Sequence, residues 1–481
     1  MASKKSSSHG TLVMKFGGTS VGTAGAMQQA AQIVFNARPV WQRLVVVTSA
    51  LSGVTNILLD TAAEAAQGRL DGLDKAEAAL REKHAGIADA LIPDPAARSL
   101  AMDEVSTLIA LFVDLCKAIA MLGEATPRAL DAVASLGERM SVRLLAPVIS
   151  AAGVPAKYIE ASQLIVTNAN FQNAHPDFDA TTERTRQALE PFFAAGIVPV
   201  ITGFIGATPD GIITTLGRGG SDYSAGILGA VLPADDVWIW TDVDGVMTAD
   251  PRMVPQARTL PEITYGEVAE LAYYGAKVLH PKTIRPIVEA GIGLRICNTF
   301  NPSHPGTRLI PNHPANGGAR NGKQVIKAVT AVRKQKLITI EGRGMLGVPG
   351  VAARAFAAVA STGTSVPLIT QASSEQSICF AVPSEAAAAV LAALEQVFAS
   401  EIVDRDIDRV WSTEDVAIIT VVGTGTRHTP GVAGQIFTCL GESEVNVLAI
   451  AHGSSDVSIS LAVESRQTEK AIKSLHELIV K

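Results

Sequence analysis

Short apolar runs rich in β-branched residues alternate with amphipathic stretches over the first 310 residues of the chain. The longest amphipathic stretch runs from about Asp71 to Ala146, is rich in Ala, Leu and Glu, and predicts helix. This alternation predicts an α/β fold with a largely parallel sheet between layers of helices, in which ligands bind beyond the carboxyl ends of the strands. The runs that predict strands are Thr11–Phe16, Leu44–Thr48, Ile197–Ile205, Gly211–Thr215, Val237–Thr241 and Leu294–Cys297.

The last third of the chain contains an internal repeat. Pro349–Phe356 matches Pro430–Phe437, 81 residues later, and the register holds without a gap as far as Val382 and Val463. Each copy predicts a turn, an amphipathic helix, a strand, a Ser-rich turn and a second strand. The chain therefore ends in two copies of one α+β unit, at about 336–400 and 414–481.

The division of the chain follows from these patterns. Residues 311–324 are dense in Pro, Asn and Gly, which predicts a linker. We expect an α/β domain at 11–310 before that linker and the tandem α+β region at 325–481 after it. The polar, Ser-rich residues 1–10 predict a disordered tail, whether native or a remnant of an expression tag.

The composition fits a folded, soluble protein of more than one domain. The 481 residues are 47% apolar and 18% charged, too apolar a balance for a disordered chain. The formal charge of −6 argues against nucleic-acid binding, which needs a basic surface. No apolar run approaches the roughly 20 residues of a membrane helix, and the first residues lack the apolar core of a secretory signal. Neither a membrane nor export is expected.

The four cysteines are scattered, with no pair at the two-residue spacing of zinc or redox motifs. They are Cys116, Cys297, Cys379 and Cys439. This spacing argues against a disulfide framework or a zinc site, and it indicates free thiols in a cytoplasmic protein.

Lys15 stands at the end of the first predicted strand and is followed by Gly17 and Gly18. Glycines let the backbone approach a ligand closely, and their N–H groups can converge on an anion. A lysine at the strand end can place an ammonium group on a phosphoryl group in transfer. The motif is not a Walker A loop, in which the lysine follows the glycines. Taken alone, a Gly-Gly turn after a strand is equally compatible with a structural role.

A hydroxyl-rich loop, Thr48–Asn56, follows the second predicted strand. Its Ser and Thr side chains either cap the next helix or face a substrate. Thr55 is the residue that we place against substrate.

The densest cluster of site features lies between Thr215 and Ser224. Three glycines surround Arg218 ahead of an apolar helix at Ala225–Leu232. A helix N-terminus attracts anions, and the planar guanidinium of Arg218 suits a carboxylate. Asp222 either orients Lys15 or a magnesium ion, or stabilises its own helix.

Two carboxylates, Asp242 and Asp244, follow the strand at Val237–Thr241. Their spacing resembles the start of a calcium loop, but no glutamate occupies the twelfth position, which excludes an EF-hand. Further along, Lys277 lies beside a helix junction, and we interpret His280 as a packing or capping residue.

Taken together, the motifs bring cations to strand ends without a catalytic nucleophile. Lys15, Arg218 and Lys277 accompany glycine loops and a few carboxylates, and no Ser-His-Asp or Cys-His set is evident. Phosphoryl transfer needs this combination, because catalysis there is positioning and charge neutralisation. A carboxylate acceptor is already ionised at pH 7, so no general base is required.

In this order the motifs resemble those of the aspartate kinase family, within the amino acid kinase superfamily. The repeat resembles the family's pair of ACT regulatory domains. The resemblance implies an amino acid kinase fold followed by two ferredoxin-like α+β domains. The matching segments are Lys15–Val21, Ser49–Asn56, Leu136–Glu138, Leu216–Tyr223, Thr241–Gly245, Thr248–Arg252 and Ala276–Pro281.

The resemblance also implies a role for each matching residue. Lys15 and Asp222 would form the phosphoryl-transfer core. Arg218 would take the α-carboxylate of aspartate and Glu138 its α-ammonium, with Thr55 and Ser221 beside them. The nucleotide would bind as ATP with Mg²⁺, whose protein ligands stay open. The residues implied to hold the nucleotide are Gly17, Gly18, Thr241, Asp242, Arg252, Lys277 and Val278. At Met247 many relatives carry a tyrosine, which leaves the adenine contact open.

The ACT segments resemble those of kinases fused to homoserine dehydrogenase, many of which respond to threonine. The implied effector contacts are Gln371, Ser373, Ser374 and His452. No dehydrogenase is expected after Lys481. In this family the second ACT unit is inserted into the first, so Val325–Val332 is expected to join the last strands. ACT units pair across subunits, which implies a homodimer or homotetramer.

The leading hypothesis is an aspartate kinase that makes 4-phospho-L-aspartate for lysine, threonine and methionine synthesis. Feedback by threonine is favoured over feedback by lysine. One alternative is a sister carboxylate or carbamate kinase, and another is a non-catalytic amino-acid sensor with a decayed kinase domain.

Overall fold

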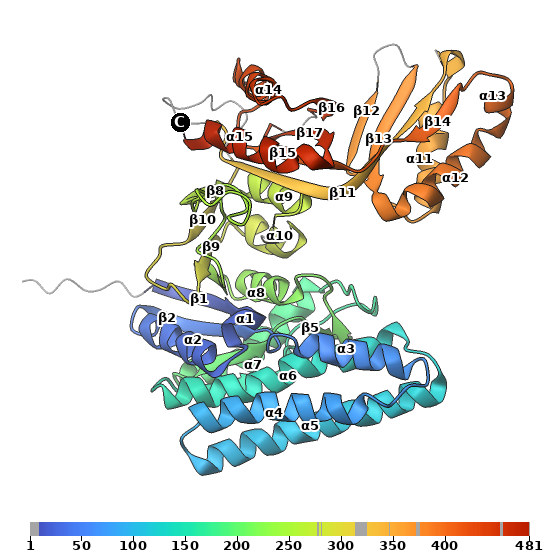
Figure 1. Ribbon diagram of the computed structural model, residues 1–481. Coiled ribbons are helices and arrows are strands. Elements are labelled where there is room, and N and C mark those ends of the chain that lie inside the picture. Colours follow the sequence, from blue (N-terminus) through green and yellow to red (C-terminus); the bar gives the residue numbers. More distant parts are fainter. Residues whose placement is uncertain are drawn as a thin grey trace, which may run out of the picture. The chain divides into compact units, whose positions relative to one another are not determined.

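The computed structural model describes residues 9–276, 279, 281–312, 325–345, 347–371, 376–452 and 456–480. The chain divides into two compact units, drawn in Figure 1. The first comprises Met1–Val246, Pro261–Tyr265 and Leu279–Pro311. The second comprises Met247–Leu260, Gly266–Val278 and Asn312–Lys481. Each unit has a sheet of its own.

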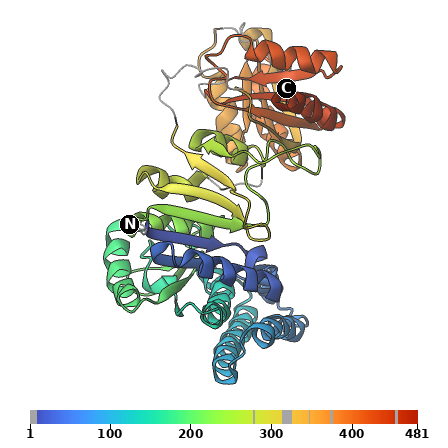
Figure 2. The same ribbon diagram turned by 90° about the vertical axis from the view of Figure 1, so that its left-hand side faces the viewer.

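An eight-stranded sheet organises the first unit, in the order β3-β4-β2-β1-β7-β9-β10-β8. Every neighbouring pair is parallel except β9 and β10. Figure 2 shows β1 and β2 in blue beside β7 in green, with β9 and β10 in yellow. The strands are β1 (His9–Phe16), β2 (Trp41–Thr48), β3 (Ala156–Ile159), β4 (Val198–Thr202), β7 (Asp236–Thr241), β8 (Glu262–Thr264), β9 (Gly293–Asn298) and β10 (Thr307–Ile310), and a separate hairpin pairs β5 (Ile205–Ala207) with β6 (Ile213–Thr215).

Helices cover both faces of this sheet, as the alternation of apolar runs predicted. On β1, Leu12 and Phe16 point into a core that the helices α2 to α6 complete. On the opposite face, Gly229 of α8 lies against Val237 of β7. The helices of the unit are α1 (Gly18–Val21), α2 (Ala24–Ala37), α3 (Val54–Ala65), α4 (Leu73–Leu91), α5 (Pro95–Leu122), α6 (Pro127–Ala151), α7 (Phe178–Ala194), α8 (Gly220–Val231) and α10 (Pro281–Glu289), with the short 3-10 turn η1 (Ala161–Gln163).

Two predicted elements are subdivided in the structure. The stretch from Asp71 to Ala146 forms three helices, because Pro95 and Pro127 each start a new one and Gly123 ends α5 in the left-handed region. The run Ile197–Ile205 forms two strands, because Phe204 has a φ of 68° and breaks the extended backbone.

Helix α5 is long and apolar enough to cross a membrane by length and composition. Charged residues such as Glu104 and Lys117 interrupt its apolar run, which is why the sequence did not suggest a span. Its residues Val105, Ile109 and Phe112 are buried in the core of the first unit. We therefore interpret α5 as a core helix.

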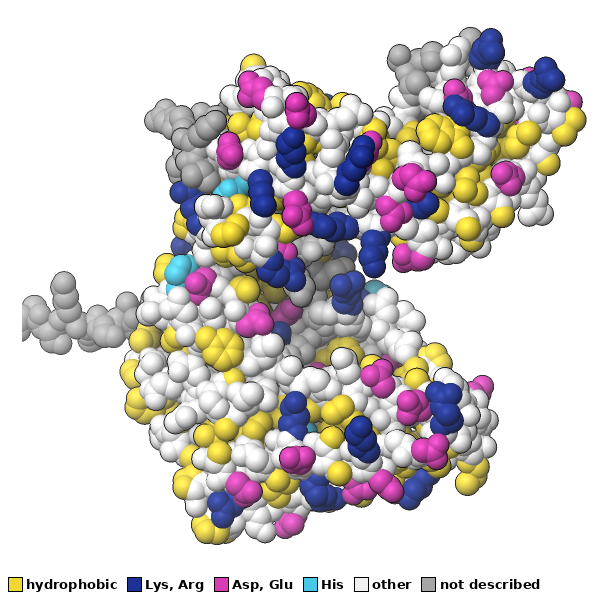
Figure 3. Space-filling view, in the orientation of Figure 1, with side chains coloured by type: hydrophobic (Ala, Val, Ile, Leu, Met, Phe, Trp, Pro, Cys, Tyr) yellow, Lys and Arg dark blue, Asp and Glu magenta, His cyan; other side chains and the backbone are white. Residues whose placement is uncertain are grey.

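Charged side chains of both signs share the visible surface. In Figure 3, Lys and Arg side chains lie interspersed with Asp and Glu over both units. This distribution agrees with the formal charge of −6.

The second unit carries the internal repeat. Its sheet has the order β12-β13-β11-β15-β17-β16, with β14 added beside β11. The strands are β11 (Ala328–Glu341), β12 (Leu368–Gln371), β13 (Ser377–Pro383), β14 (Arg409–Ser412), β15 (Val416–Val422), β16 (Val447–Ala451) and β17 (Ser458–Glu464). The helices are α9 (Tyr265–Tyr273), α11 (Val351–Ser361), α12 (Ala387–Val397), α13 (Ala399–Val403), α14 (Val432–Glu442) and α15 (Thr468–Val480), with 3-10 turns η2 (Arg343–Met345), η3 (Ser384–Ala386) and η4 (Ser465–Gln467).

One long strand, β11, serves both copies of the repeat. Its C-terminal half pairs with β13 and β14 of the first copy, and its N-terminal half pairs with β15 of the second copy. A register shift between Val332 and Gln335, where Lys334 has a φ of 57°, separates the halves. Residues Ala328–Val332, within the segment expected to join the last strands, thus pair with β15 of the second copy. Of the predicted linker 311–324, residues 313–324 lie outside the described residues.

Two segments that precede the repeat in sequence are built into the second unit. The buried carboxylate of Glu267 on α9 accepts hydrogen bonds from the backbone N–H and hydroxyl of Thr424, both at 2.7 Å. The ammonium of Lys327 lies 2.8 Å from the same carboxylate. Thr248 lies 2.9 Å from the Nε2 atom of buried His476 on α15. Polar contacts thus hold both segments to the repeat.

Candidate functional site

A cleft of about 580 Å³ opens in the first unit at the carboxyl ends of β1 and β2. It is the kind of concave site, beyond strand ends, that α/β folds use for ligands. Of the residues predicted from sequence, Lys15, Gly18, Thr55, Glu138, Arg218, Ser221 and Asp222 line it. The first unit alone therefore brings together both predicted catalytic residues and all four predicted acceptor residues.

Lys15 and Asp222 meet in this cleft. The ammonium of Lys15, at the end of β1, lies 2.6 Å from a carboxylate oxygen of Asp222 in the first turn of α8. Lys15 is 8% exposed, so few water molecules compete for its charge. A Cβ atom on Gly17 would lie 3.6 Å from that ammonium. The structure thus pairs Asp222 with Lys15, and its place in the first turn of α8 is also that of a helix-stabilising carboxylate.

Glu138 is a buried carboxylate on α6 that faces the cleft. Burial raises its pKa to about 8, while the Ala50 backbone and the charge of Lys15 act in the opposite direction. Its Oε2 atom has no hydrogen-bond partner within the described part of the chain. A Cβ atom on Gly137 would lie 2.7 Å from the Ala50 side chain, so glycine is needed for α6 to approach the 48–56 loop. A desolvated carboxylate with one unpartnered oxygen is a site for a cationic ligand group.

Thr55 lies in the first turn of α3, directly after the loop that joins β2 to this helix. The N-cap of α3 is Gly53, with a φ of 83° and no side-chain cap. Its Ser and Thr side chains therefore do not cap this helix, and the capping alternative is wrong. The backbone N–H of Ser52 bonds to the carbonyl of Gly18, which joins this loop to the one after β1.

Arg218 reaches the cleft from the turn before α8, and Ser221 reaches it from the first turn of that helix. Gly217 and Gly219 adopt φ values of 79° and 71°, which side chains other than glycine rarely tolerate. No carboxylate within the described residues lies within ion-pair distance of Arg218. A guanidinium without a protein counter-ion, beside the desolvated Glu138, leaves the cleft with one cationic and one anionic group for a zwitterion.

The residues predicted to hold the nucleotide are distributed differently. Thr241 ends β7 and Asp242 follows it. Because β7 pairs in parallel with β1, both stand next to Gly17 at the same sheet edge. They do not line the cleft described above. Arg252 belongs to the second unit, is exposed, and bonds to Asp250. Lys277 and Val278 lie outside the described residues.

A protein-held metal cluster is absent from the described residues, where no three His, Cys, Asp or Glu side chains come together. Mg²⁺ that arrives on a nucleotide keeps phosphate oxygens and water as ligands and needs one or two carboxylates from the protein. Asp222 and Asp242, both in the first unit, can supply them.

The predicted effector contacts belong to the second unit. Gln371 ends β12 and is exposed. His452, at the equivalent position of the second copy, follows β16 and is also exposed. Ser373 and Ser374 lie outside the described residues.

Among the residues of the cleft that the sequence did not suggest are Asp131, Gln172 and Phe204. Asp131 lies seven residues before Glu138, two helical turns away on one face of α6, and this spacing could have pointed to it. Gln172 and Phe204 adopt φ values of 67° and 68°. No local sequence signal predicts a left-handed backbone at these side chains.

Two family models match the chain. One describes the amino acid kinase family and matches residues 10–298. The other describes the ACT domain and matches residues 338–398 and 419–478. The two models correspond to the α/β region and to the two copies of the repeat.

Two curated relatives show how far the similarity extends. The chain is 38% identical over 472 residues to "Bifunctional aspartokinase/homoserine dehydrogenase 1, chloroplastic" of Zea mays, covering 96% of this chain and 50% of that relative. It is 31% identical over 503 residues to "Aspartokinase" of Schizosaccharomyces pombe, covering 98% and 93%. The chain thus spans about half the length of the bifunctional relatives that it matches.

The fold also matches solved structures along its length. Crystal structures of E. coli aspartokinase III, one in complex with aspartate and ADP and one with lysine and aspartate, superpose with TM-scores of 0.79 and 0.78. Both are 30% identical in sequence and cover 98% of this chain and 100% of theirs.

Proposed function

This chain belongs to the amino acid kinase family and carries ACT domains, and from this premise we propose that it is an aspartate kinase. It transfers the γ-phosphoryl group of ATP to the β-carboxylate of L-aspartate and yields 4-phospho-L-aspartate and ADP. Lysine, threonine and methionine synthesis would draw on this product. The S. pombe relative is named aspartokinase, and an E. coli aspartokinase III structure contains aspartate and ADP.

One observation carries the proposal: the cleft gathers the complementary groups that a short amino dicarboxylate needs. Glu138 is desolvated and receives the α-ammonium group. Arg218 forms two parallel hydrogen bonds with the α-carboxylate. Thr55 and Ser221 donate hydroxyl hydrogen bonds to the remaining oxygens, so that the β-carboxylate points toward Lys15.

The reaction then needs no general base. One β-carboxylate oxygen attacks the γ-phosphorus, a new P–O bond forms, and the bond to the bridging oxygen of ADP breaks. Lys15, held by Asp222, stabilises the charge on the transferring group. A carboxylate is fully ionised at pH 7, so no proton has to leave the acceptor.

The nucleotide is held on the neighbouring strand end. Gly17 and Gly18 offer backbone N–H groups to the phosphates, and Thr241, Asp242, Arg252, Lys277 and Val278 complete the set. Mg²⁺ supplies charge neutralisation on the phosphates when it is bound. Asp222 and Asp242 are the carboxylates that would hold it.

The ACT units provide feedback control by an end-product amino acid. Gln371 and His452, with Ser373 and Ser374, contact the effector, and threonine is favoured over lysine. Lysine is a second candidate, because an E. coli aspartokinase III structure contains it. Initial rates with each amino acid alone and with both together identify the effector.

A homodimer or homotetramer forms through the ACT units. Exposed Ile369 on β12 and Ile450 on β16 occupy equivalent positions of the repeat and offer apolar surface for such pairing. The enzyme works in the cytoplasm, in keeping with its free cysteine thiols.

The proposal is tested by trapping the acyl phosphate as a hydroxamate with L-aspartate, L-glutamate and N-acetylglutamate as acceptors. An aspartate kinase forms hydroxamate and ADP with aspartate and much less with the longer acids. A sister carboxylate kinase prefers one of the longer acids. A protein without turnover on any of them is a sensor, not an enzyme.

A further inference from the structure

Asp131 is a buried carboxylate without a cationic partner. It is 1% exposed, and no Lys, Arg or His of the described chain lies within ion-pair distance of it. Four contacts hold its two oxygens. The Thr215 N–H and hydroxyl donate at 2.8 and 2.7 Å. The Gln172 N–H lies 3.1 and 3.0 Å from the two oxygens.

These contacts fix the segment from which the acceptor arginine projects. Thr215 ends β6, and Arg218 follows three residues later. The carbonyl of Thr215 accepts from Ala174 at 2.9 Å, and the N–H of Leu216 donates to Phe204 at 2.9 Å. A Cβ atom on Gly217 would lie 2.9 Å from the carbonyl of Gln172. The turn around Arg218 therefore rests against the segment that Asp131 holds.

Two strained backbone positions lie in the segments that contact Asp131 and the turn before Arg218. Gln172 and Phe204 are both non-glycine residues at positive φ, and both line the cleft. Such residues persist where surrounding contacts over-determine them, and they are common at ligand sites. The double contact from the Gln172 N–H to Asp131 is one of the bonds that compensate for its unfavourable φ.

We propose that Asp131 is a positioning residue for the acceptor, one that sets the place of Arg218 by holding Thr215 and Gln172. It lies on the face of α6 that also carries Glu138, so a single helix positions both groups that recognise the amino acid. Asp131 acts through Arg218 and does not touch the reacting atoms. The inference rests on the proposed function, since it concerns how that acceptor is held.

A carboxylate does this better than an amide. Asp131 accepts from three donors with two charged oxygens, and hydrogen bonds to a charged acceptor are worth about 1.5–3 kcal/mol each. An Asn side chain has one acceptor oxygen, and its NH₂ group would face an N–H donor. Asp131→Asn is therefore expected to loosen the turn while it keeps the side-chain volume.

Steady-state kinetics separates this role from a general loss of structure. Asp131→Asn is expected to raise KM for aspartate about 10- to 100-fold, the range that follows from losing one such bond. KM for ATP is expected to stay within about twofold, because the nucleotide residues follow other strands. Thr215→Val removes one donor and is expected to raise KM for aspartate about threefold to tenfold; it decides the question if Asp131→Asn does not fold.

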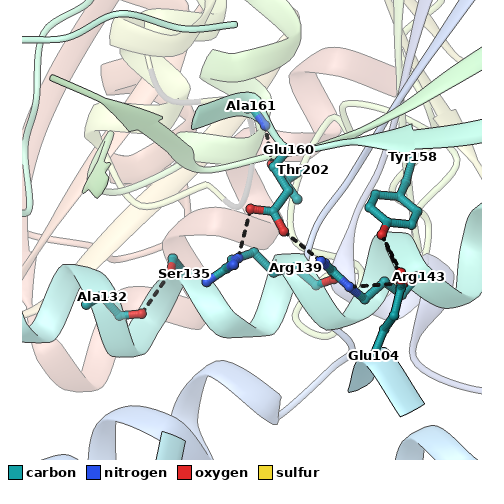
Figure 4. A network of polar contacts seen from close by, with 9 residues as sticks. All are labelled: Glu104, Ala132, Ser135, Arg139, Arg143, Tyr158, Glu160, Ala161 and Thr202. Carbon is teal, nitrogen blue, oxygen red and sulfur yellow. Dashed lines mark hydrogen bonds and ion pairs between the residues drawn. The ribbon is translucent and has the colours of Figure 1, made fainter. Parts of the chain in front are cut away.

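Glu160, which follows β3 and pairs with two arginines of the same helix α6, provides a matched control. It receives Arg139 and Arg143 of α6, each at 2.9 Å, and joins them to a set that includes Tyr158 and Glu104, as Figure 4 shows. None of its partners lines the acceptor cleft. Glu160→Gln is expected to lower Tm and to leave KM for aspartate within about twofold of wild type.

A double-mutant cycle supplies the decisive readout. If Asp131 acts through Arg218, then Asp131→Asn in an Arg218→Ala background adds less than about twofold to KM for aspartate. Full additivity of the two effects overturns the proposal. Equal rises in KM for aspartate and for ATP overturn it too. So does an unchanged KM for aspartate in Asp131→Asn. Where that variant does not fold, an unchanged KM for aspartate in Thr215→Val has the same meaning. Turnover of the wild-type protein tests the proposed function separately. If the wild type forms no ADP in the presence of aspartate, the proposed function is wrong whatever Asp131 does.

Discussion

The residues proposed for the acceptor and those proposed for the nucleotide are organised differently. Lys15, Glu138 and Arg218 line one cleft in the first unit. Thr241 and Arg252, proposed for the nucleotide, belong to different units. The difference shows that the residues proposed for the acceptor meet within one folded unit, whereas those proposed for the nucleotide are divided between the two units.

The largest effect is expected from substitution of Lys15, which serves both the acceptor and the nucleotide. Lys15→Ala removes the cation on the transferring phosphoryl group and leaves Asp222 without its partner. We expect kcat to fall roughly 1,000-fold or more, the scale seen when one charge-stabilising donor is removed. ADP release coupled to a second enzyme measures the rate.

Circular dichroism and thermal melting provide the control for Lys15→Ala and should show a folded protein. A folded variant with near-normal turnover would remove Lys15 from the chemistry and leave the cleft a binding site only.

Substitution of Glu138 is expected to affect recognition of the acceptor alone. Glu138→Gln removes the anion opposite the α-ammonium group, and we expect kcat/KM for aspartate to fall about 100-fold. KM for ATP is expected to change little. Comparable losses for both substrates would show that Glu138 supports the fold of the whole cleft.

The pKa of Glu138 predicts the pH dependence. Burial raises that pKa to about 8, and only the ionised carboxylate binds an ammonium group. The kcat/KM for aspartate should therefore fall about tenfold per pH unit below about 8, because that parameter reports the free enzyme. Glu138→Gln should flatten this limb of the profile. A wild-type profile that is already flat between pH 6 and 8 would assign the ammonium to another group.

The same shift affects folding stability with a defined sign. The pKa of Glu138 is about 8 in the fold, against an ordinary value of 4.5. The unfolded chain loses this proton first as the pH rises, so the folded state of the free protein is destabilised between those two values. Tm measured without substrates should fall across this range more steeply in wild type than in Glu138→Gln. If the Tm of wild type and of Glu138→Gln changed in parallel with pH, the raised pKa of Glu138 would be contradicted.

Glu267 tests whether the stability of the second unit is separate from aspartate binding in the first. Its side chain is 0% exposed and holds Lys327 and Thr424. Glu267→Gln leaves Lys327 without its anion, and we expect a loss of about 2–3 kcal/mol in the stability of that unit. The acceptor cleft lies in the other unit, so aspartate binding should persist. Hydrogen exchange would report the effect, and protection lost equally in both units would contradict the division.

Arg252 gives the smallest effect. It is exposed and pairs with Asp250, so it makes at most a screened contact with phosphate. Arg252→Gln is expected to raise KM for ATP by about threefold and to leave KM for aspartate unchanged. A raised KM for aspartate with an unchanged KM for ATP would assign Arg252 to the acceptor.

Much of this arrangement was predictable from local sequence signals. Strand–helix alternation predicted the parallel sheet, and the lysine and glycines after β1 predicted the phosphate side of the site. The repeat predicted both ACT units, and Ala328–Val332, within the segment expected beside the last strands, pairs with β15.

The remainder depends on contacts between residues far apart in the chain. Asp131 meets Thr215, 84 residues away, and Glu267 meets Thr424, 157 residues away. Neither pair leaves a local periodicity. The positive φ of Phe204 is imposed by tertiary packing and not by residue type. Local patterns therefore predicted elements and motif residues, while long-range polar contacts determined how the cleft is held.

Calorimetric titration of L-aspartate into nucleotide-free protein tests the central claim most directly. If the acceptor site is complete within the first unit, saturable binding should be seen without ATP, and Glu138→Gln and Arg218→Ala should each weaken it about 100-fold. Binding that needs a non-hydrolysable ATP analogue, or that neither substitution weakens, would show that aspartate is recognised somewhere else or only after the nucleotide has bound.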